Sequence, residues 1–139
     1  MGGNSGPGFR EHPDYRVDIR RIDARVEVAL ADHVVSVTTG ALEVLETQHR
    51  PVLYVPKDDL CEDYVRASDT ETYCPFKGFA TYWSLQVGDC LANDALWIYA
   101  APFDEVSELS EYVGVYANRV DSIRVDGQAL ESREPGLIG

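Results

Sequence analysis

The sequence is poor in the residues that form covalent or metal-based cross-links. Its 139 residues include three cysteines and three histidines: Cys61, Cys74, Cys90, His12, His33 and His49. No two cysteines form a Cys-x-x-Cys pair, and the histidines have no ligand-like spacing. Structural zinc sites need closely spaced ligands, and a disulfide framework needs paired cysteines. The sequence therefore predicts reduced thiols, no metal site and no resident cofactor.

Positive charge is also scarce. The chain has 24 acidic and 12 basic residues, which give a formal net charge of −12. This excess of negative charge repels a phosphate backbone, so we expect no nucleic-acid partner. Only two of the basic residues are lysines, Lys57 and Lys77. Lysine supplies a compact ammonium with a tunable pKa, so Lys57 and Lys77 are candidates for a functional site. The alternative is that both are ordinary surface residues in a sequence that otherwise uses arginine.

Long apolar runs and familiar catalytic motifs are missing as well. There is no run of transmembrane length and no secretory signal at Met1, which predicts a cytoplasmic protein with no membrane partner. There is no Gly-rich phosphate loop, Gly-x-Ser-x-Gly elbow, His-Glu-x-x-His helix or dinucleotide fingerprint. The protein is expected to be a monomer or a homodimer joined through a sheet edge.

Short β-branched and aromatic segments, separated by turn residues, make up most of the chain. This pattern predicts a mainly β fold with antiparallel sheets. We expect a single β-rich domain over residues 15–127. The Gly- and Pro-rich residues 1–14 are expected to form a flexible tail, and residues 128–139 a second one.

The spacing of apolar residues predicts the individual strands, turns and helix. Residues 25–38 predict a hairpin, residues 52–55 a strand ending in a turn, and residues 39–50 one short helix. The clearest strand, residues 79–87, places Phe79 and Trp83 on the core face and Tyr82 on the other. A turn is expected at residues 93–94, before a strand that carries Trp97 and Tyr99 on one face.

The stretch "TYCPFKGFATYWS", residues 72–84, concentrates the reactive groups. A thiol near a cation can be partly thiolate, so Cys74 is a candidate nucleophile beside Lys77. No histidine is placed to act as its general base, which favours a structural role for Cys74. Lys77 is the stronger candidate, because Gly78 allows a close approach to a ligand. A structural salt bridge of Lys77 to Glu46, Asp58 or Asp59 is the equal alternative.

Four tyrosines lie on strands whose opposite face is more apolar: Tyr54, Tyr82, Tyr99 and Tyr116. Several phenols that converge beside an ammonium would suit a small polar or aromatic ligand. An ordinary polar-faced sheet with partly exposed tyrosines is the alternative.

Four segments in order, "LEVLETQHRPVLYVPKDDL", "TYCPFKGFATYWSL", "NDALWIYAAPFDEV" and "YVGVYANRVD", resemble the family called domain of unknown function 427, also labelled nucleotidyltransferase-like. The resemblance covers about residues 12–125. It implies a small β-tent domain, similar to methionine sulfoxide reductase B and some zinc-bearing modules. Neither zinc nor that activity is carried over, because the required cysteine motifs are absent. Thr39, Gly40 and Ala41 stand where relatives often carry Ser-Arg-Ala.

The residues that match the family pattern are Glu46, Tyr54, Pro56, Asp58, Thr72, Cys74, Pro75, Lys77, Gly78, Tyr82, Trp83, Trp97, Tyr99, Pro102, Gly114 and Tyr116.

These observations lead to one principal hypothesis of function. The protein is expected to bind a small polar or aromatic metabolite, and to act on it as a cofactor-independent enzyme if it is an enzyme. Lys77, Tyr82 and Glu46 are the catalytic candidates. The ligand-binding candidates are Tyr54, Asp58, Thr72, Cys74, Trp97, Tyr99 and Tyr116. A non-catalytic structural or interaction module is the second hypothesis, and a nucleotidyltransferase is the third.

Overall fold

The computed structural model describes residues 4–129, which form a mainly β fold of two antiparallel sheets and one short α-helix. The strands are β1 (Val17–Arg21), β2 (Val26–Leu30), β3 (His33–Thr38), β4 (Leu42–Glu46), β5 (Val52–Pro56), β6 (Val65–Cys74), β7 (Gly78–Val87), β8 (Cys90–Ile98), β9 (Tyr112–Val115), β10 (Ser122–Val125) and β11 (Gln128–Ala129). The helical segments are α1 (Pro7–Glu11) and the 3₁₀ helices η1 (Lys57–Asp59), η2 (Glu62–Tyr64), η3 (Asp104–Glu111) and η4 (Ala117–Arg119).

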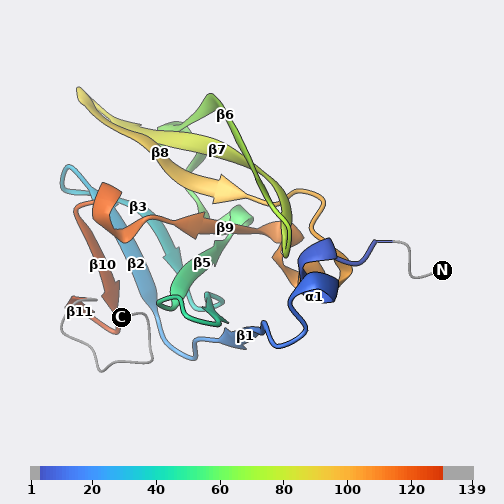
Figure 1. Cartoon of the computed structure of the whole chain (residues 1–139). Coiled ribbons are helices and arrows are strands. Elements are labelled where there is room, and N and C mark those ends of the chain that lie inside the picture. Colours follow the sequence, from blue (N-terminus) through green and yellow to red (C-terminus); the bar gives the residue numbers. More distant parts are fainter. Residues whose placement is uncertain (1–3, 130–139) are drawn as a thin grey trace.

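The larger sheet has seven strands in the order β1-β4-β5-β9-β8-β7-β6, and the smaller has four in the order β11-β10-β2-β3. In Figure 1 the long strands β6, β7 and β8 lie at the top, the four-stranded sheet lies at the left, and α1 lies at the right. The mainly β, antiparallel fold that the sequence predicts is therefore confirmed, and so is the hairpin of β2 and β3.

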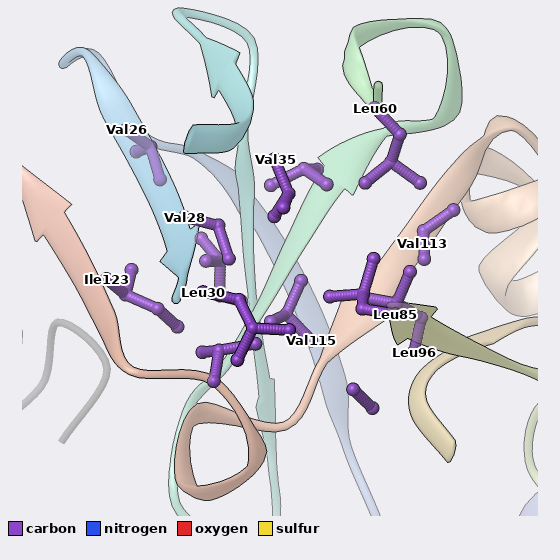
Figure 2. Packing of buried hydrophobic residues seen from close by; sticks show 14 of the residues in the cluster. Val26, Val28, Leu30, Val35, Leu60, Leu85, Leu96, Val113, Val115 and Ile123 are labelled. Atoms are coloured by element: carbon purple, nitrogen blue, oxygen red, sulfur yellow. The ribbon is translucent and has the colours of Figure 1, made fainter. Parts of the chain in front are cut away.

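The principal core lies between the two sheets. Val26, Val28 and Leu30 from β2 belong to the same cluster as Leu85 of β7 and Leu96 of β8, and all five are at most 3% exposed (Figure 2). Burying an aliphatic side chain of this size contributes about 1.5–3 kcal/mol each. This core joins the sheets into one body.

A second apolar cluster covers the opposite face of the seven-stranded sheet. Side chains alternate along a strand, so Leu96 and Ile98 enter the first core while Trp97 and Tyr99 enter the second cluster. Val106 and Leu109 of η3 pack on this cluster. The facing of Trp97 and Tyr99 agrees with the sequence prediction, and it places the tyrosine-rich face away from the smaller sheet.

The helix predicted over residues 39–50 is wrong. That segment contains strand β4, which pairs with β1 on one side and β5 on the other. Leu42 and Val44 both enter the second cluster, as the period of two in a strand requires. Pairing with two neighbouring strands overrides the weak helical stripe in this short segment.

Strand β7 also departs from its predicted pattern. Phe79 is 61% exposed, because the first core reaches only the Leu85 end of the strand. Trp83 is half-buried at the edge of that core. The turn predicted at residues 93–94 is wrong: Asp94 lies inside β8 with φ of 50°, where the pairing with β7 shifts register. The shift is a β-bulge rather than a chain reversal.

The chain before β1 differs from the predicted tail. Residues 7–11 form α1, and the Gly8 amide donates to the Pro75 carbonyl at 2.9 Å. The Ser5 hydroxyl and the Gly6 amide also donate to the Glu105 carboxylate. The predicted C-terminal tail begins with β11, and its residues 130–139 lie outside the described residues. Within residues 4–129, no helix has the length and apolar character needed to cross a membrane.

Candidate functional site

Lys77 is held by the tight turn that joins β6 to β7. Its amide donates to the Cys74 carbonyl at 3.2 Å, and its carbonyl accepts from the Phe103 amide at 3.0 Å. Gly78 follows with φ of 115°, a conformation that favours glycine. A side chain at this position would bring its Cβ to 3.4 Å from the Ala101 carbonyl oxygen. The turn therefore fixes the backbone of Lys77, and its side chain is only 6% exposed.

Glu46, the last residue of β4, is the partner of that ammonium. Lys77 Nζ donates to Glu46 Oε1, and the Tyr15 hydroxyl donates to Glu46 Oε2. The Glu46 side chain is 13% exposed. Removing two charges from water costs several kcal/mol per ion, and the loss is offset only when further hydrogen bonds complete the pair. The Tyr15 hydroxyl supplies such a hydrogen bond, so the three residues form one largely buried polar unit.

Tyr15 was not predicted by the sequence as a site residue. Its ring stacks on Phe76 at a centroid distance of 3.8 Å, and Phe76 belongs to the same turn as Lys77. Burial, and then the hydrogen bond to Glu46, raise the pKa of its phenol. Strand pairing places Tyr15 beside Glu46. Val17 of β1, two residues after Tyr15, lies directly opposite Glu46 of β4. The sequence-predicted helix at β4 concealed that pairing.

Buried aromatic rings form the floor next to this unit. Trp97 Nε1 donates to the Tyr54 hydroxyl at 3.0 Å, and the two rings meet edge to face at 5.6 Å. Burial raises the pKa of both Tyr54 and Tyr99. These two phenols therefore remain protonated near neutral pH. Their place in the second cluster makes them scaffold.

Half-exposed hydroxyl groups lie at the other end of the face. The Tyr82 hydroxyl and Thr72 Oγ1 are 3.0 Å apart. Burial, followed by the hydrogen bond to Tyr82, raises the pKa of Tyr116. The Arg119 guanidinium lies 4.5 Å from the centroid of the Tyr116 ring. Tyr82 and Tyr116 therefore present phenols that a ligand can reach from solvent.

The structure brings most of the predicted site residues to this one face, in two groups. Lys77 and Glu46 lie in the first group, but the hydroxyl bound to them belongs to Tyr15 rather than to Tyr82. The second group comprises Tyr82, Thr72 and Tyr116. Between the groups lie Tyr54, Trp97, Tyr99 and the half-buried thiol of Cys74.

Asp58 does not join this arrangement. It lies on η1, where it lines a different cavity, together with Trp83 and other residues that are not part of the tyrosine-lined face. Glu46 in turn borders a shallow hollow of about 380 Å³, whose other lining residues come from the β1 and β4 edge. Among residues 4–129, no three His, Cys, Asp or Glu side chains are grouped so that they could hold a metal ion.

Comparison with known proteins adds one finding. A family model described as Domain of unknown function (DUF427) matches residues 18–126. The match spans all the strands from β2 to β10 and the whole Cys74–Gly78 turn, but leaves Tyr15 and α1 outside it. No curated protein matches the chain.

Proposed function

The chain belongs to the family Domain of unknown function (DUF427), and from this premise we propose that the protein binds a small polar or aromatic metabolite on its tyrosine-lined face. The observation that carries the proposal is the largely buried unit of Lys77, Glu46 and Tyr15, on the same face as the half-exposed hydroxyls of Tyr82 and Tyr116. Strongly buried charge beside accessible polar groups is typical of functional sites.

Each group has a distinct part in this scheme. Tyr82 and Thr72 contact the ligand by hydrogen bonds. Their hydroxyls are 3.0 Å apart, and neither carries a charge that binding would have to desolvate. Lys77 supplies positive charge beneath the face, and Glu46 orients its ammonium. Tyr54, Trp97 and the other buried rings form an apolar floor that suits a flat ligand.

The same groups support cofactor-independent chemistry on the bound metabolite. A phenol that is hydrogen-bonded to a second hydroxyl, as Tyr82 is to Thr72, can donate a proton or stabilise a developing negative charge on the ligand. Lys77 would strengthen that stabilisation electrostatically, with Glu46 and Tyr15 as positioning residues. A cytoplasmic location, a monomeric or homodimeric state and the lack of a nucleic-acid partner belong to this proposal.

A non-catalytic structural or interaction module is the second candidate. One observation favours it: Lys77 and Glu46 satisfy each other, with Tyr15 on the remaining oxygen, and Lys77 is 6% exposed. In that case the unit serves only to tie the segment before β1 to β4 and to the β6–β7 turn. Nucleotidyl transfer, which the family label suggests, is the third candidate.

Thermal unfolding in the presence of polar and aromatic metabolites tests the proposal. A metabolite that binds the folded state raises the Tm, and Tyr82→Phe should then weaken its binding about tenfold while the free protein unfolds at an unchanged temperature. Tyr73→Phe is the matched control, because Tyr73 is on the neighbouring strand and 47% exposed. Lys77→Met should abolish binding, and Cys74→Ser should have a small effect.

The alternatives predict other results. Unfolding of Lys77→Met, together with metabolites that never stabilise the wild type, identifies a structural module. A ligand that binds Tyr82→Phe and Lys77→Met as tightly as the wild type overturns the proposed site. Stabilisation by a nucleotide only in the presence of Mg²⁺ would instead support nucleotidyl transfer.

A further inference from the structure

A second hollow lies apart from the tyrosine-lined face. Its volume is about 810 Å³, within the range of small-molecule sites. It is formed by η1, η2, the start of β6 and the middle of β7. Its lining residues are Lys57, Asp58, Leu60, Glu62, Val65 and Trp83.

Trp83 forms the aromatic wall of this hollow. The chain has two tryptophans, and Trp97 is 8% exposed with its N–H bonded to Tyr54. Trp83 is half-buried, and among residues 4–129 its indole N–H has no hydrogen-bond partner. Leu60 and Val65 border the same space. One wall of the hollow is thus apolar and aromatic, and it retains an unused donor.

The charge of the hollow is negative. Asp58 and Glu62 are exposed, and neither carboxylate has an ion-pair or hydrogen-bond partner among the described residues. The single cation in the lining, Lys57, lies 3.7 Å from the carboxylate of Glu111 and is largely compensated. The net charge of −12 on the whole chain adds to the negative potential.

We propose that this hollow binds an organic cation whose charged group is attached to a flat or apolar body, such as an arylalkyl ammonium. The indole face attracts a cation through its quadrupole, and this contact contributes about 0.5–2 kcal/mol. The carboxylates of Asp58 and Glu62 neutralise the same charge, while Leu60 and Val65 cover the apolar body. A carboxylate or phosphate ligand would meet two unpaired carboxylates, and a neutral ligand would leave them uncompensated.

Benzylammonium is a suitable probe, and the indole N–H signals in ¹H–¹⁵N NMR are a suitable readout. The two tryptophans give two indole signals, and Trp83→Phe identifies which belongs to Trp83. We expect benzylammonium to shift the Trp83 signal in a saturable manner and to leave the Trp97 signal in place. Benzoate should produce no saturable shift, and benzyl alcohol should bind at least about fivefold more weakly than benzylammonium.

A pair of double variants tests the role of charge. Asp58→Asn/Glu62→Gln should weaken benzylammonium binding about fivefold, in line with two exposed charge contacts. Asp59→Asn/Asp63→Asn changes the net charge by the same amount on the same two 3₁₀ helices, outside the lining of this hollow, and should change the affinity less than twofold.

Three results would overturn the proposal: a Trp83 signal that does not shift, equal affinities for benzyl alcohol and benzylammonium, or equal weakening in both double variants. Retention of the remaining amide signals shows that each variant is folded. The Trp83 signal and the Asp58/Glu62 double variant report on this hollow, whose lining contains no residue of the tyrosine-lined face. Failure of this proposal is therefore distinguishable from failure of the metabolite site on the tyrosine-lined face.

Discussion

At the scale of single residues, the polar unit around Glu46 depends on complete pairing of its two oxygens. Lys77 takes one oxygen and Tyr15 takes the other, in a place where the carboxylate is 13% exposed. A hydrogen bond to a charged group contributes about 1.5–3 kcal/mol, because its loss leaves the charge desolvated and unpaired. Tyr15 is therefore as important to this unit as the ion pair itself.

Tyr15→Phe should lower the free energy of unfolding by about 2 kcal/mol, since the ring can still stack on Phe76 while the hydrogen bond to Glu46 is lost. Chemical denaturation measures the change. Tyr112→Phe is the control, because Tyr112 packs on the same cluster and has no side-chain hydrogen bond among the described residues; it should change stability by less than about 0.5 kcal/mol. Equal effects of the two substitutions would show that the Tyr15 hydroxyl is not a structural partner.

Glu43 is a second buried carboxylate, and it is less completely satisfied. Its side chain is 1% exposed; Oε1 accepts a hydrogen bond from Arg20 at 2.7 Å, and Oε2 has no hydrogen-bond partner among residues 4–129. The two residues lie opposite each other on β4 and β1. The guanidinium is 60% exposed, so the pair is buried only on the acid side.

Arg20→Met should destabilise the protein by about 3 kcal/mol, because it leaves a buried carboxylate without its cation. Arg20→Met/Glu43→Leu should recover most of that loss, since an apolar pair has no charge to desolvate. The four unfolding free energies form a double-mutant cycle. A double variant that is no more stable than Arg20→Met would contradict the assignment of the loss to unpaired charge.

At the scale of elements, the seven-stranded sheet is built to bury different residues on its two faces. Strands β8 and β9 show this most clearly: Leu96 and Val113 enter the first core, whereas Trp97 packs in the second cluster. The Trp97 ring lies over Gly114, its partner across the two strands. A Cβ on Gly114 would come within 2.1 Å of that ring, so the strand needs glycine for space rather than for conformation.

Gly114→Ala should therefore destabilise the protein by about 2–3 kcal/mol through overpacking. It should also displace Trp97 from the Tyr54 hydroxyl, which the Trp97 indole N–H signal in NMR reports. Gly88→Ala is the contrasting change, since no atom lies within 4 Å of that Cβ and its cost comes only from a φ of 58°. An unshifted Trp97 signal in Gly114→Ala would contradict the packing described for β8 and β9.

Helix α1 and the residues around it pack across the β6–β7 turn. The Gly8 amide binds the Pro75 carbonyl, and Phe9 packs edge to face on Phe76 at 5.1 Å. Helix α1 and Tyr15 thus cover the turn that carries Lys77. Both Tyr15 and α1 lie outside the matched family region, residues 18–126.

At the scale of the whole molecule, buried phenols couple folding to alkaline pH. Burial raises the folded-state pKa of Tyr15, Tyr54 and Tyr99 above the value of about 10 for a solvated phenol. A raised folded-state pKa means that the folded protein holds these protons more tightly than the unfolded chain does. The resulting stabilisation is complete below about pH 10 and declines as the pH rises beyond it.

We expect these three phenols to ionise only as the protein unfolds, whereas exposed tyrosines such as Tyr73, 47% exposed, ionise first. Spectrophotometric titration of phenolate absorbance should therefore show two phases, and the second should coincide with the loss of circular dichroism. A single phase near pH 10 in a protein that is still folded would contradict the burial described here.

The sequence predicted the fold class, the family and the residues of the β6–β7 turn, because these depend on local pattern. In residues 95–99, successive side chains of a strand point to opposite faces, so Trp97 and Leu96 lie on different faces whichever strands pair with this one. The same reasoning failed at β4, where Leu42 and Leu45 fit a helical stripe about as well as Leu42 and Val44 fit a strand. It also failed at Phe79, whose exposure depends on where the smaller sheet ends.

The amino-acid sequence alone determined that this protein has a mainly β fold, a formal net charge of −12 and a turn that holds Lys77 beside a glycine. Only the tertiary structure decided that Glu46 and Tyr15, 31 residues apart, share one buried site, and that Asp58 and Trp83 line another. The reason is physical: strand pairing and sheet packing set which distant side chains meet, and a local apolar period carries no information about those partners.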